Sequence, residues 1–543
     1  MLAVEKIQTD VLVIGSGTAG LAAATYAALE DKQVLILDKG ALGRSGSSTG
    51  AVQIAGLGDW SHEEDDTERY LEDIYTSGRG LSNPNLAKTL VHDIDQRIQD
   101  LIDWGLKLDR EGDQVSVSHT SGHSLPRSVS AKKGKAGLGL LHTLRKKVTK
   151  DERITTLSDV MTIKLIKSDE RVVGALVLEL STNKFFLIQS KATVLATGGA
   201  GQLYPITSNP VQSTGDGFSL GLQAGATLID MEQVQFYPVS IIEPQSIAGL
   251  CISFYHYSKL FNNKGERFMK HYAPDTLEDA TRDTLSIAIA TEISEGRGPI
   301  WLDATDVIDQ VKKEFSHEYQ LCLDRGVDLA NKRAQVGPAA HFMMGGVRID
   351  ADAKTDVEGL FVAGETAGGL HGGNRLGNNA LSECLVFGAR AGMNAAKLVD
   401  DVTVSTLDAN PIRINQYGNH RPFEIKQHIQ HSMSSYVEVI RKNEGLREAL
   451  NQLLNVREQL ENVQISNPDV YSREIVDYIE AQHMVNTAEA IVRSALERQE
   501  SRGSHYNTDY PDLTSTIKHN LVRMKNHQFQ VQPEEVESSE TKR

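Results

Sequence analysis

The stretch that decides the fold is DVLVIGSGTAGLAAATYAALE, residues 10–30. An apolar strand runs into the glycine pattern formed by Gly15, Gly17 and Gly20, and an alanine-rich helix follows. A second apolar strand, QVLILD, then closes with Asp38. This order of strand, glycine turn, helix, strand and acid is typical of a dinucleotide-binding βαβ unit. We therefore predict an α/β protein that begins with a Rossmann-like domain.

The glycine turn predicts a phosphate site for a physical reason. Glycine lets a backbone lie against a pyrophosphate, and the first amides of a helix have no partner within it. An acid at the end of the second strand can accept a hydrogen bond from a ribose hydroxyl. The residues expected to contact the cofactor here are Gly15, Ser16, Gly17, Thr18, Ala19, Gly20 and Asp38.

Further glycine-rich segments lie far along the chain. The strand ATVLATGG ends at residues 197–199, STGDG occupies 213–217, and GLFVAGETAGGLHGGNRLGNNALSECLVFG fills 359–388. Because nucleotide-binding elements stand at both ends of residues 1–400, one extended cofactor should span them. FAD fits better than NAD, which would not require a second glycine-rich segment so far downstream.

Composition narrows the class of protein. The chain has 543 residues and a formal net charge of -16, which argues against nucleic acid or an anionic membrane as its main partner. Cys251, Cys322 and Cys384 are too far apart in sequence for a disulfide framework or for an iron–sulfur cluster held by this chain alone. We find no apolar run of signal-peptide or membrane-spanning length, so a cytoplasmic protein is expected. No metal site is predicted.

The changes in pattern along the chain predict an FAD-binding domain interrupted by an α+β capping domain and followed by a helical domain. The predicted boundaries are 1–230 for the first part of the FAD-binding domain, 231–340 for the capping domain, 341–400 for the second part, 401–423 for a linker, 424–510 for the helical domain and 511–543 for a C-terminal tail. The end of that tail, QPEEVESSETKR (532–543), has the composition of a disordered segment.

Read together, the motifs resemble a known family. The chain is similar to the flavoprotein subunits of succinate dehydrogenase and fumarate reductase, and to L-aspartate oxidase, over nearly its whole length. The motifs that carry the resemblance are GSGTAG (15–20), RSGSSTGAVQIA (44–55), GHSLPR (122–127), LATGGAGQLY (195–204), STGDG (213–217), KGERFM (264–269), EDATRD (278–283), HFMMGG (341–346), AGETAGGLHGGNRLGNNAL (363–381) and ESRGSHYNTDYP (500–511).

The resemblance implies further FAD contacts. It places Glu365 at the adenosine ribose and the start of a helix at residues 379–381 against the flavin ring. In the family a covalent flavin link uses a histidine two residues after an arginine, where this chain has Gly46, so it implies a non-covalent FAD. The additional implied contacts are Lys39, Arg44, Ser45, Gly46, Ser47, Thr49, Gly50, Ala51, Thr197, Gly198, Asp216, Glu365, Asn379, Ala380 and Leu381.

The resemblance also implies the chemistry. The family reaction is hydride transfer between the flavin and a carbon next to a carboxylate, with proton transfer at the neighbouring carbon. Arg375 would bind a substrate carboxylate through its bidentate fork, and His341 would add a hydrogen bond. Arg282 matches the family's proton-transferring arginine. His371 has either a functional or a purely structural place in its glycine-rich turn.

The chain departs from the family where the substrate is chosen. Tyr237 and Val239 stand where the family has histidine and threonine, so one carboxylate contact is replaced by a neutral hydroxyl. Leu250, Cys251 and Phe254 stand where the family has the threonine, glutamate and arginine that serve the proton relay.

The residues that follow offer a substitute for the relay. Tyr255, His256, Tyr257 and Lys259 could form a rebuilt relay, a pocket of different shape or a solvent-facing strand. Tyr237 and His256 are therefore added to the candidate catalytic residues.

These features leave several functions open. The leading hypothesis is a flavin oxidoreductase for a small anionic substrate, with a separate iron–sulfur or other redox partner. The alternatives are an amino-acid oxidase like L-aspartate oxidase and a flavoprotein without catalysis of its own. A further alternative is sulfur chemistry like that of adenylylsulfate reductase, whose flavin-bearing chain the Arg-Ser-Gly sequence at 44–46 resembles. In that case the basic loop 132–135, with Arg127, would hold an anionic or nucleotide-like substrate, unless it is only a solvated loop.

Overall fold

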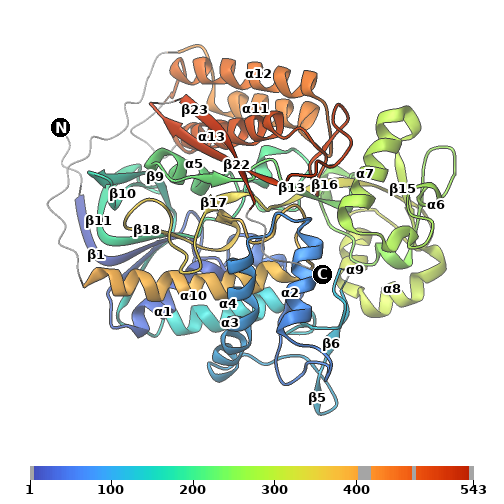
Figure 1. The fold of residues 1–543 in the computed structure, drawn as a ribbon, viewed down its shortest axis with the longest axis horizontal. Helices are drawn as coiled ribbons and strands as arrows, with labels where there is room; N and C mark the ends of the chain where they lie inside the picture. The colour runs from blue at the N-terminus through green and yellow to red at the C-terminus, as the bar shows by residue number, and fades with distance from the viewer. Residues whose placement is uncertain (1–4, 121, 401–417, 467–472, 527, 537–543) are drawn as a thin grey trace.

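A central sheet of seven strands organises the molecule (Figure 1). In this computed structural model, residues 5–120, 122–400, 418–466, 473–526 and 528–536 are described. The strand order is β8 (Ile154–Leu157), β2 (Val34–Leu37), β1 (Glu5–Ile14), β11 (Lys184–Leu195), β10 (Arg171–Glu179) and β9 (Val160–Ser168), with β18 (Leu360–Val362) also paired to β11. Strands β8, β2, β1, β11 and β18 are parallel to one another, so their carboxyl ends meet at one edge.

Two helices that are distant in sequence pack tightly below this sheet. Figure 1 shows α1 (Thr18–Leu29) and α10 (Asn379–Val399) lying side by side. A Cβ at Gly388 would come within 2.6 Å of the Ala19 carbonyl oxygen, and a Cβ at Gly392 would overlap the Ala23 carbonyl oxygen. Glycine on α10 therefore lets the two helices touch through their backbones, which brings the second glycine-rich region beside the first.

The capping domain forms a separate lobe, at the right of Figure 1. Its antiparallel sheet has the order β13 (Val234–Ile241), β16 (Ala334–Met343), β15 (Ile300–Asp303) and β14 (Lys259–Phe261). Four helices surround this sheet: α6 (Met269–Tyr272), α7 (Arg282–Glu292), α8 (Ile308–Glu314) and α9 (Ser316–Asp324). The lobe has its own hydrophobic core, built from residues between 237 and 336.

The helical domain follows. It consists of α11 (Pro422–Tyr436), α12 (Asn443–Glu461) and α13 (Arg473–Glu497), which pack on one another and, through α13, on α5 (Asp216–Ala224). Most of the predicted linker, residues 401–417, lies outside the described residues. Within the described ranges, no helix combines the length and the apolarity needed to cross a bilayer.

The C-terminal tail predicted from residue 511 contains regular structure, and the disorder expected for QPEEVESSETKR (532–543) is wrong as far as Glu535, which lies in a strand; residues 537–543 lie outside the described residues. Strands β22 (Lys518–Lys525) and β23 (Gln528–Glu535) form a hairpin that joins the short strand β12 (Leu228–Ile229). Composition suggested disorder because β23 is polar and mostly exposed, but β22 buries Leu521 and Val522 and pairs with β12 along its edge. Pairing with a strand so much earlier in the chain is a tertiary effect that composition does not register.

Candidate functional site

The glycine turn lies at the carboxyl-end edge of the sheet, between β1 and α1. Gly15 has a φ of 105°, and a Cβ there would overlap the Ala196 carbonyl oxygen. A Cβ at Gly20 would overlap the Gly15 carbonyl oxygen. Only glycine fits at these two positions. Gly17, at the N-cap of α1, has no side chain to cap the helix, and the Thr18 amide makes only a long hydrogen bond, 3.4 Å, to the Ser48 hydroxyl, so the first amides of the helix can turn to a phosphate.

A cleft opens above this turn. It contains about 880 Å³ of atom-free space, part of it open to solvent, and its lining comes from both glycine-rich ends of the chain. The predicted cofactor residues in the lining are Gly15, Ser16, Gly17, Thr18, Ala19, Asp38, Lys39, Ser45, Gly46, Ser47, Thr197, Gly198, Asp216 and Glu365.

The remaining predicted cofactor residues do not line this cleft; they are Gly20, Arg44, Thr49, Gly50, Ala51, Asn379, Ala380 and Leu381. Asn379 begins α10 and is buried. Its Oδ1 accepts a hydrogen bond from the Tyr70 hydroxyl at 2.8 Å, while its Nδ2 has no partner among the described residues. A buried amide left unpaired at a helix start fits a ligand that supplies the acceptor.

Asp38 fastens two loops together. Its carboxylate accepts hydrogen bonds from the amide of Ser16 at 2.9 Å, the amide of Gly40 at 2.7 Å and the hydroxyl of Ser45 at 2.7 Å, and also from the Ser16 hydroxyl. Since a carboxylate offers about four good acceptor positions, a ribose hydroxyl must displace one of the serine hydroxyls. Direct contact between Asp38 and a ribose therefore stays a prediction.

Lys39 connects the cleft to the helical domain. Its Nζ lies 2.7 Å from the Thr214 hydroxyl, 2.9 Å from the Asp216 carboxylate and 3.0 Å from the Glu480 carboxylate on α13. Burial alone would lower the pKa of Lys39, but the two carboxylates outweigh it and raise that pKa. Lys39 is therefore a charged residue of the lining.

On the opposite side of the cleft, Glu365 is buried and accepts a hydrogen bond from the Met343 amide at 3.0 Å. Burial raises the pKa of this carboxyl group to about 7. Two glycines of the lining, Gly198 and Gly46, leave open space, because no atom lies within 4 Å of the position that a Cβ would take at either residue. Three features fit FAD: the amides at the start of α1, this open space and the unpaired amide of Asn379.

Two arginines converge next to the cofactor cleft. Arg375 Nη2 lies 3.1 Å and Arg282 Nη1 lies 3.5 Å from the same acceptor, the side-chain oxygen of Gln235. Neither guanidinium forms an ion pair with an acid in the described part of the chain, and Arg375 Nε is buried without a partner. Burial and then the neighbouring Arg282 lower the pKa of Arg375. Two unneutralised cations this close define a binding site for an anion.

His341 completes the site from β16. Its Nδ1 lies 2.8 Å from the Ser208 hydroxyl and 3.9 Å from the Cys251 sulfur. Burial and the two arginines hold the pKa of His341 well below its usual range. The imidazole is therefore neutral, and if Nδ1 accepts from Ser208 its Nε2 is a hydrogen-bond donor.

The substituted family positions lie in the same place. The Arg282 guanidinium stands 5.0 Å from the centre of the Tyr237 ring, and the His341 ring lies 5.2 Å from that ring. The Tyr237 hydroxyl donates to the Ile252 carbonyl at 3.3 Å. Burial raises the pKa of the Cys251 thiol to about 11, so it stays protonated. The pocket offers neutral donors where a histidine and a glutamate were expected.

The segment after Cys251 divides into an inner and an outer part. Tyr255 is buried, meets the Tyr237 ring edge-on at 5.9 Å and hydrogen-bonds to Arg282. His256 lies beyond Tyr255, with ring centres 5.6 Å apart, and has an exposed side chain. Within the described ranges it contacts neither Arg282 nor His341. Phe254 packs on Phe315 in the core of the lobe.

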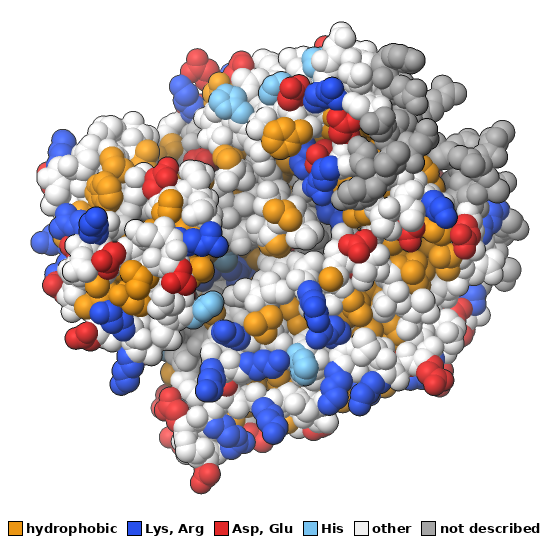
Figure 2. Space-filling model, turned by 180° about the vertical axis from the view of Figure 1, so that it is seen from behind, with side chains coloured by type: hydrophobic (Ala, Val, Ile, Leu, Met, Phe, Trp, Pro, Cys, Tyr) orange, Lys and Arg blue, Asp and Glu red, His pale blue; other side chains and the backbone are white. Residues whose placement is uncertain are grey.

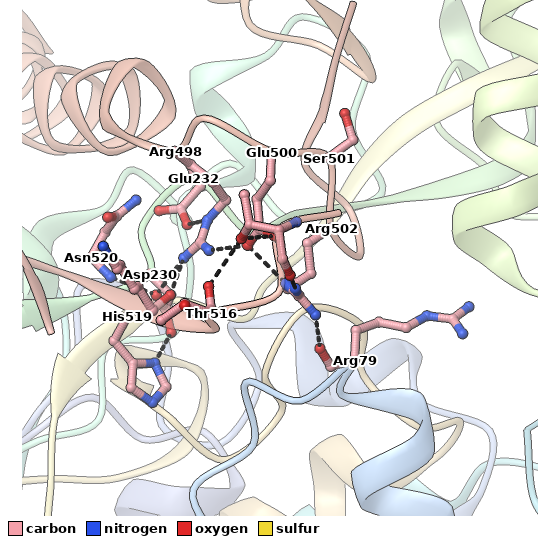
Figure 3. A network of polar contacts seen from close by, with 12 residues as sticks. Arg79, Asp230, Glu232, Arg498, Glu500, Ser501, Arg502, Thr516, His519 and Asn520 are labelled. Atoms are coloured by element: carbon pink, nitrogen blue, oxygen red, sulfur yellow. Dashed lines mark hydrogen bonds and ion pairs between the residues drawn. The ribbon is translucent and has the colours of Figure 1, made fainter. Parts of the chain in front are cut away.

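A buried ionic network holds the strand that carries this site (Figure 3). Arg498 pairs with Asp230 at 3.0 Å and also with Glu232, both just before β13. It reaches Glu500 at 3.0 Å, and Glu500 pairs in turn with Arg502 at 2.8 Å. The segment 498–502 after α13 therefore fixes the start of β13, which bears Gln235 and Tyr237.

Arg502 extends this support to Arg282. Its Nη1 donates to the Arg79 carbonyl at 2.8 Å. The Arg79 guanidinium forms an ion pair at 2.8 Å with Asp283, the residue that follows Arg282 in α7. The position of Arg282 is thus tied to the C-terminal segment.

Two other predicted residues have structural partners. Arg127 is completely buried and pairs with Asp65 at 2.6 Å and with Asp73, so it is not available to the basic loop 132–135 as proposed from the sequence. His371 is buried and contacts the Glu383 carboxylate at 3.0 Å. Its ring meets the Phe342 ring edge-on, and Arg375 stacks over that same Phe342 ring.

Sequence reasoning missed Gln235, Ser208 and Glu480, and also Ser48, Gln212 and Ser213 in the cleft lining. Gln235 stands two residues before Tyr237 in one strand, so strand alternation could have placed both on the same face. Ser208 and Glu480 carry no local signal, because each is brought in by a distant element.

A nucleotide cleft beside a pair of arginines without an acidic partner in the described residues indicates an FAD-dependent oxidoreductase, and comparison with known proteins gives the family. The FAD binding domain family matches residues 10–381, and the fumarate reductase flavoprotein C-terminal family matches residues 426–542. A CoM/CoB-type fumarate reductase chain of Methanothermobacter marburgensis is 35% identical over 95% of this chain and 97% of its own length. L-Aspartate oxidase of Pseudomonas aeruginosa is 31% identical over 95% of this chain and 98% of its own length.

The fold agrees with solved structures. The FrdA chain of E. coli quinol fumarate reductase superimposes with a TM-score of 0.90 at 26% identity, over 98% of this chain and 97% of that one. This chain belongs to the fumarate reductase flavoprotein family. The predicted α/β fold class, the FAD cofactor and the oxidoreductase class are thereby confirmed.

Proposed function

We propose that this flavoprotein transfers a hydride between bound FAD and a small carboxylate-bearing substrate at a carbon–carbon bond. The observation that carries the proposal is the convergence of Arg282 and Arg375 on Gln235 without a neutralising acid in the described residues. A small dicarboxylate, with two negative charges and little bulk, satisfies this pair. The relatives named as fumarate reductases support the same substrate class.

Each side chain has a role in that reaction. Bound FAD supplies or receives the hydride. Arg375, stacked 4.4 Å from the Phe342 ring centre, grips one carboxylate with its fork. Neutral His341 donates a hydrogen bond to the same group, which withdraws electrons from the adjoining double bond. Arg282 gives a proton to the neighbouring carbon, so that hydride and proton together reduce the double bond.

The remaining features of the proposal concern the protein's surroundings. Gly46 has no side chain to bond the flavin, so FAD is bound non-covalently, and acid precipitation of the protein should release it to the supernatant. Electrons pass to or from a separate iron–sulfur or other redox protein, as the similarity to components of larger enzymes supports. The enzyme works in the cytoplasm.

The test is anaerobic. The purified flavoprotein is reduced chemically, and reoxidation of its FAD is followed by absorbance as fumarate is added. We expect fast reoxidation that falls by about a thousandfold in Arg282→Ala, since a missing proton donor leaves the hydride step without its partner. Arg333→Ala, an exposed arginine of the same lobe, is the control and should behave as the native protein. A native flavin that stays reduced contradicts the proposal.

Amino-acid oxidation is the second candidate. It is favoured by the similarity to L-aspartate oxidase over nearly the whole chain, and it needs the same carboxylate grip by Arg375. L-Aspartate with oxygen should then give steady peroxide. If fumarate and aspartate both fail while sulfite forms a tight flavin adduct, the enzyme handles sulfur oxyanions. No turnover with a normal flavin would mean a protein that only relays electrons.

A further inference from the structure

We propose that an exposed basic surface beside the cofactor cleft docks an acidic electron-carrier protein, which exchanges electrons with the bound FAD. This rests on the proposed function, which requires a protein redox partner, and it adds the place and the charge of that partner. We call this area the α4 surface, after α4 (Ala136–Val148). It comprises Arg44, Lys132, Lys133, Lys135, His142, Lys146 and Lys150, all with exposed side chains.

The charge of the α4 surface is opposite to that of the protein. The chain carries 72 acidic and 56 basic residues. Even so, no lysine or arginine of the α4 surface forms an ion pair with an acid in the described ranges. His142 records the local potential, since its pKa is lowered first by the charge of Lys132 and also by Arg145 and Lys146. Figure 2 shows Lys and Arg side chains gathered on the lower part of the rear face.

Helix energetics explain only part of this charge. Arg145, Lys146 and Lys147 stand in the last turn of α4, where cations complement the helix dipole. At the other end, Lys135 occupies the N-cap, where a cation is unfavourable. Lys132 and Lys133 have φ values of 51° and 59°, in the left-handed region that disfavours lysine. The Asp109 carboxylate holds this loop through the backbone amides of Lys133 and Gly134, at 2.9 Å and 2.8 Å, so the contact does not depend on the lysine side chains.

The α4 surface is joined directly to the cofactor cleft. The Gly137 amide donates to the Ala51 carbonyl at 2.9 Å and the Ala136 amide to the Val52 carbonyl at 3.1 Å. A Cβ at Gly137 would overlap the carbonyl of Ser48, a residue of the cleft lining. The first turn of α4 thus packs on a loop that borders the cofactor cleft. A carrier docked here has the short path to FAD that electron transfer requires.

The partner is identified by its chemistry. An overall charge of -16 repels acidic proteins at long range, so a local basic surface is needed to bind and orient one. Reduction is balanced when two one-electron carriers are oxidised in turn while FAD gains two electrons and a proton from solvent. The redox protein that fits is small and acidic and carries one electron.

The test uses the holoprotein and a plant-type [2Fe–2S] ferredoxin as the acidic carrier. Lys132→Glu, Lys135→Glu and Lys146→Glu are combined in one variant. Lys270→Glu, Lys313→Glu and Lys332→Glu, on exposed positions of the capping lobe, give a control of equal net charge. Two quantities are measured: the dissociation constant of oxidised ferredoxin, and the anaerobic rate of FAD reduction by reduced ferredoxin. Neither needs the organic substrate, so failure here is separable from failure of the proposed function.

We expect the α4 variant to weaken ferredoxin binding and slow FAD reduction by about tenfold or more at low salt, with the control within about threefold of native. Raising the salt from about 0.05 M to about 0.5 M should remove most of the difference. Dithionite, a small dianion, should reduce native protein and both variants at similar rates. Equal effects of the two variants would overturn the proposal. The proposal would also be overturned if the α4 variant slowed FAD reduction by dithionite but not by ferredoxin, because the surface would then be a small-anion site.

Discussion

The cofactor cleft and the substrate pocket are neighbours, but they are made of different parts of the protein. The glycine turn that shapes the cleft is formed by backbone: a left-handed Gly15, the start of α1 with glycine at its N-cap, and glycines that leave open space. The pocket is formed by side chains that β13, α7 and β16 bring from three segments. Backbone geometry constrains which residues can stand in a cleft, whereas a side-chain pocket can change its chemistry while its walls stay. Here the cleft keeps its pattern, and the pocket has exchanged its histidine and glutamate.

The largest effect should come from the pocket. Arg375→Ala removes the only guanidinium that both stacks on Phe342 and bonds Gln235 within the described residues, so the anion loses its bidentate partner. We expect the rate constant for reoxidation by fumarate, relative to its Michaelis constant, to fall by about a thousandfold or more. FAD content, measured by absorbance, should stay native. Loss of FAD along with the activity would mean that pocket and cleft are not separable.

The cleft is tested by Gly15→Ala. The added methyl group would overlap the Ala196 carbonyl and meet a φ of 105°, so the turn that faces the phosphates must shift. We expect FAD affinity to fall by about a hundredfold in titrations of the apoprotein. Gly326→Ala is the matched control, because its φ of 84° carries the same strain with nothing within 4 Å. It should lose some stability and keep its FAD affinity. Equal losses of affinity would refute the backbone argument.

The same contrast explains what the sequence could and could not predict. The βαβ unit could be predicted from the sequence because local geometry requires glycine in its turn, at Gly15, Gly17 and Gly20. The pairing of Arg282 with Arg375 came only through family resemblance, since no local pattern relates residues in different elements. Glu480 and Ser208 were missed because the contacts that bring them in are made by tertiary packing. The β22–β23 hairpin was missed for the same reason.

A smaller effect is expected at Tyr255, one of the residues proposed from the sequence as a rebuilt proton relay. Tyr255 is buried, hydrogen-bonds to Arg282, and has its pKa raised by burial. The negative charge of Asp279, an exposed residue, also raises the pKa of Tyr255. Tyr255→Phe should slow reoxidation by fumarate by about tenfold and change its solvent deuterium isotope effect, because a proton-transfer step is altered. The neighbouring Tyr257, 46% exposed, gives the control Tyr257→Phe. Indistinguishable variants would leave Tyr255 a packing residue.

The smallest effect concerns the network that holds both regions. His519 on β22 contacts Asp230 at 2.6 Å, next to the Arg498 network of Figure 3. Burial alone would lower the pKa of His519, but the Asp230 carboxylate outweighs it and raises that pKa. A raised folded-state pKa means that the ion pair stabilises the fold fully below the unfolded value of about 6.5, and that this stability is lost as pH rises through the folded value.

His519→Gln should therefore lower the free energy of unfolding by about 1 kcal/mol near pH 6 and by less near pH 9. Urea unfolding at the two pH values measures this, with His431→Gln, an exposed histidine of the helical domain, as control. A gap that widens with pH would show that His519 is neutral in the folded protein. Because Asp230 precedes the strand that bears Gln235, reoxidation by fumarate should follow the same pH trend while FAD affinity does not. That outcome would separate support of the pocket from support of the cleft.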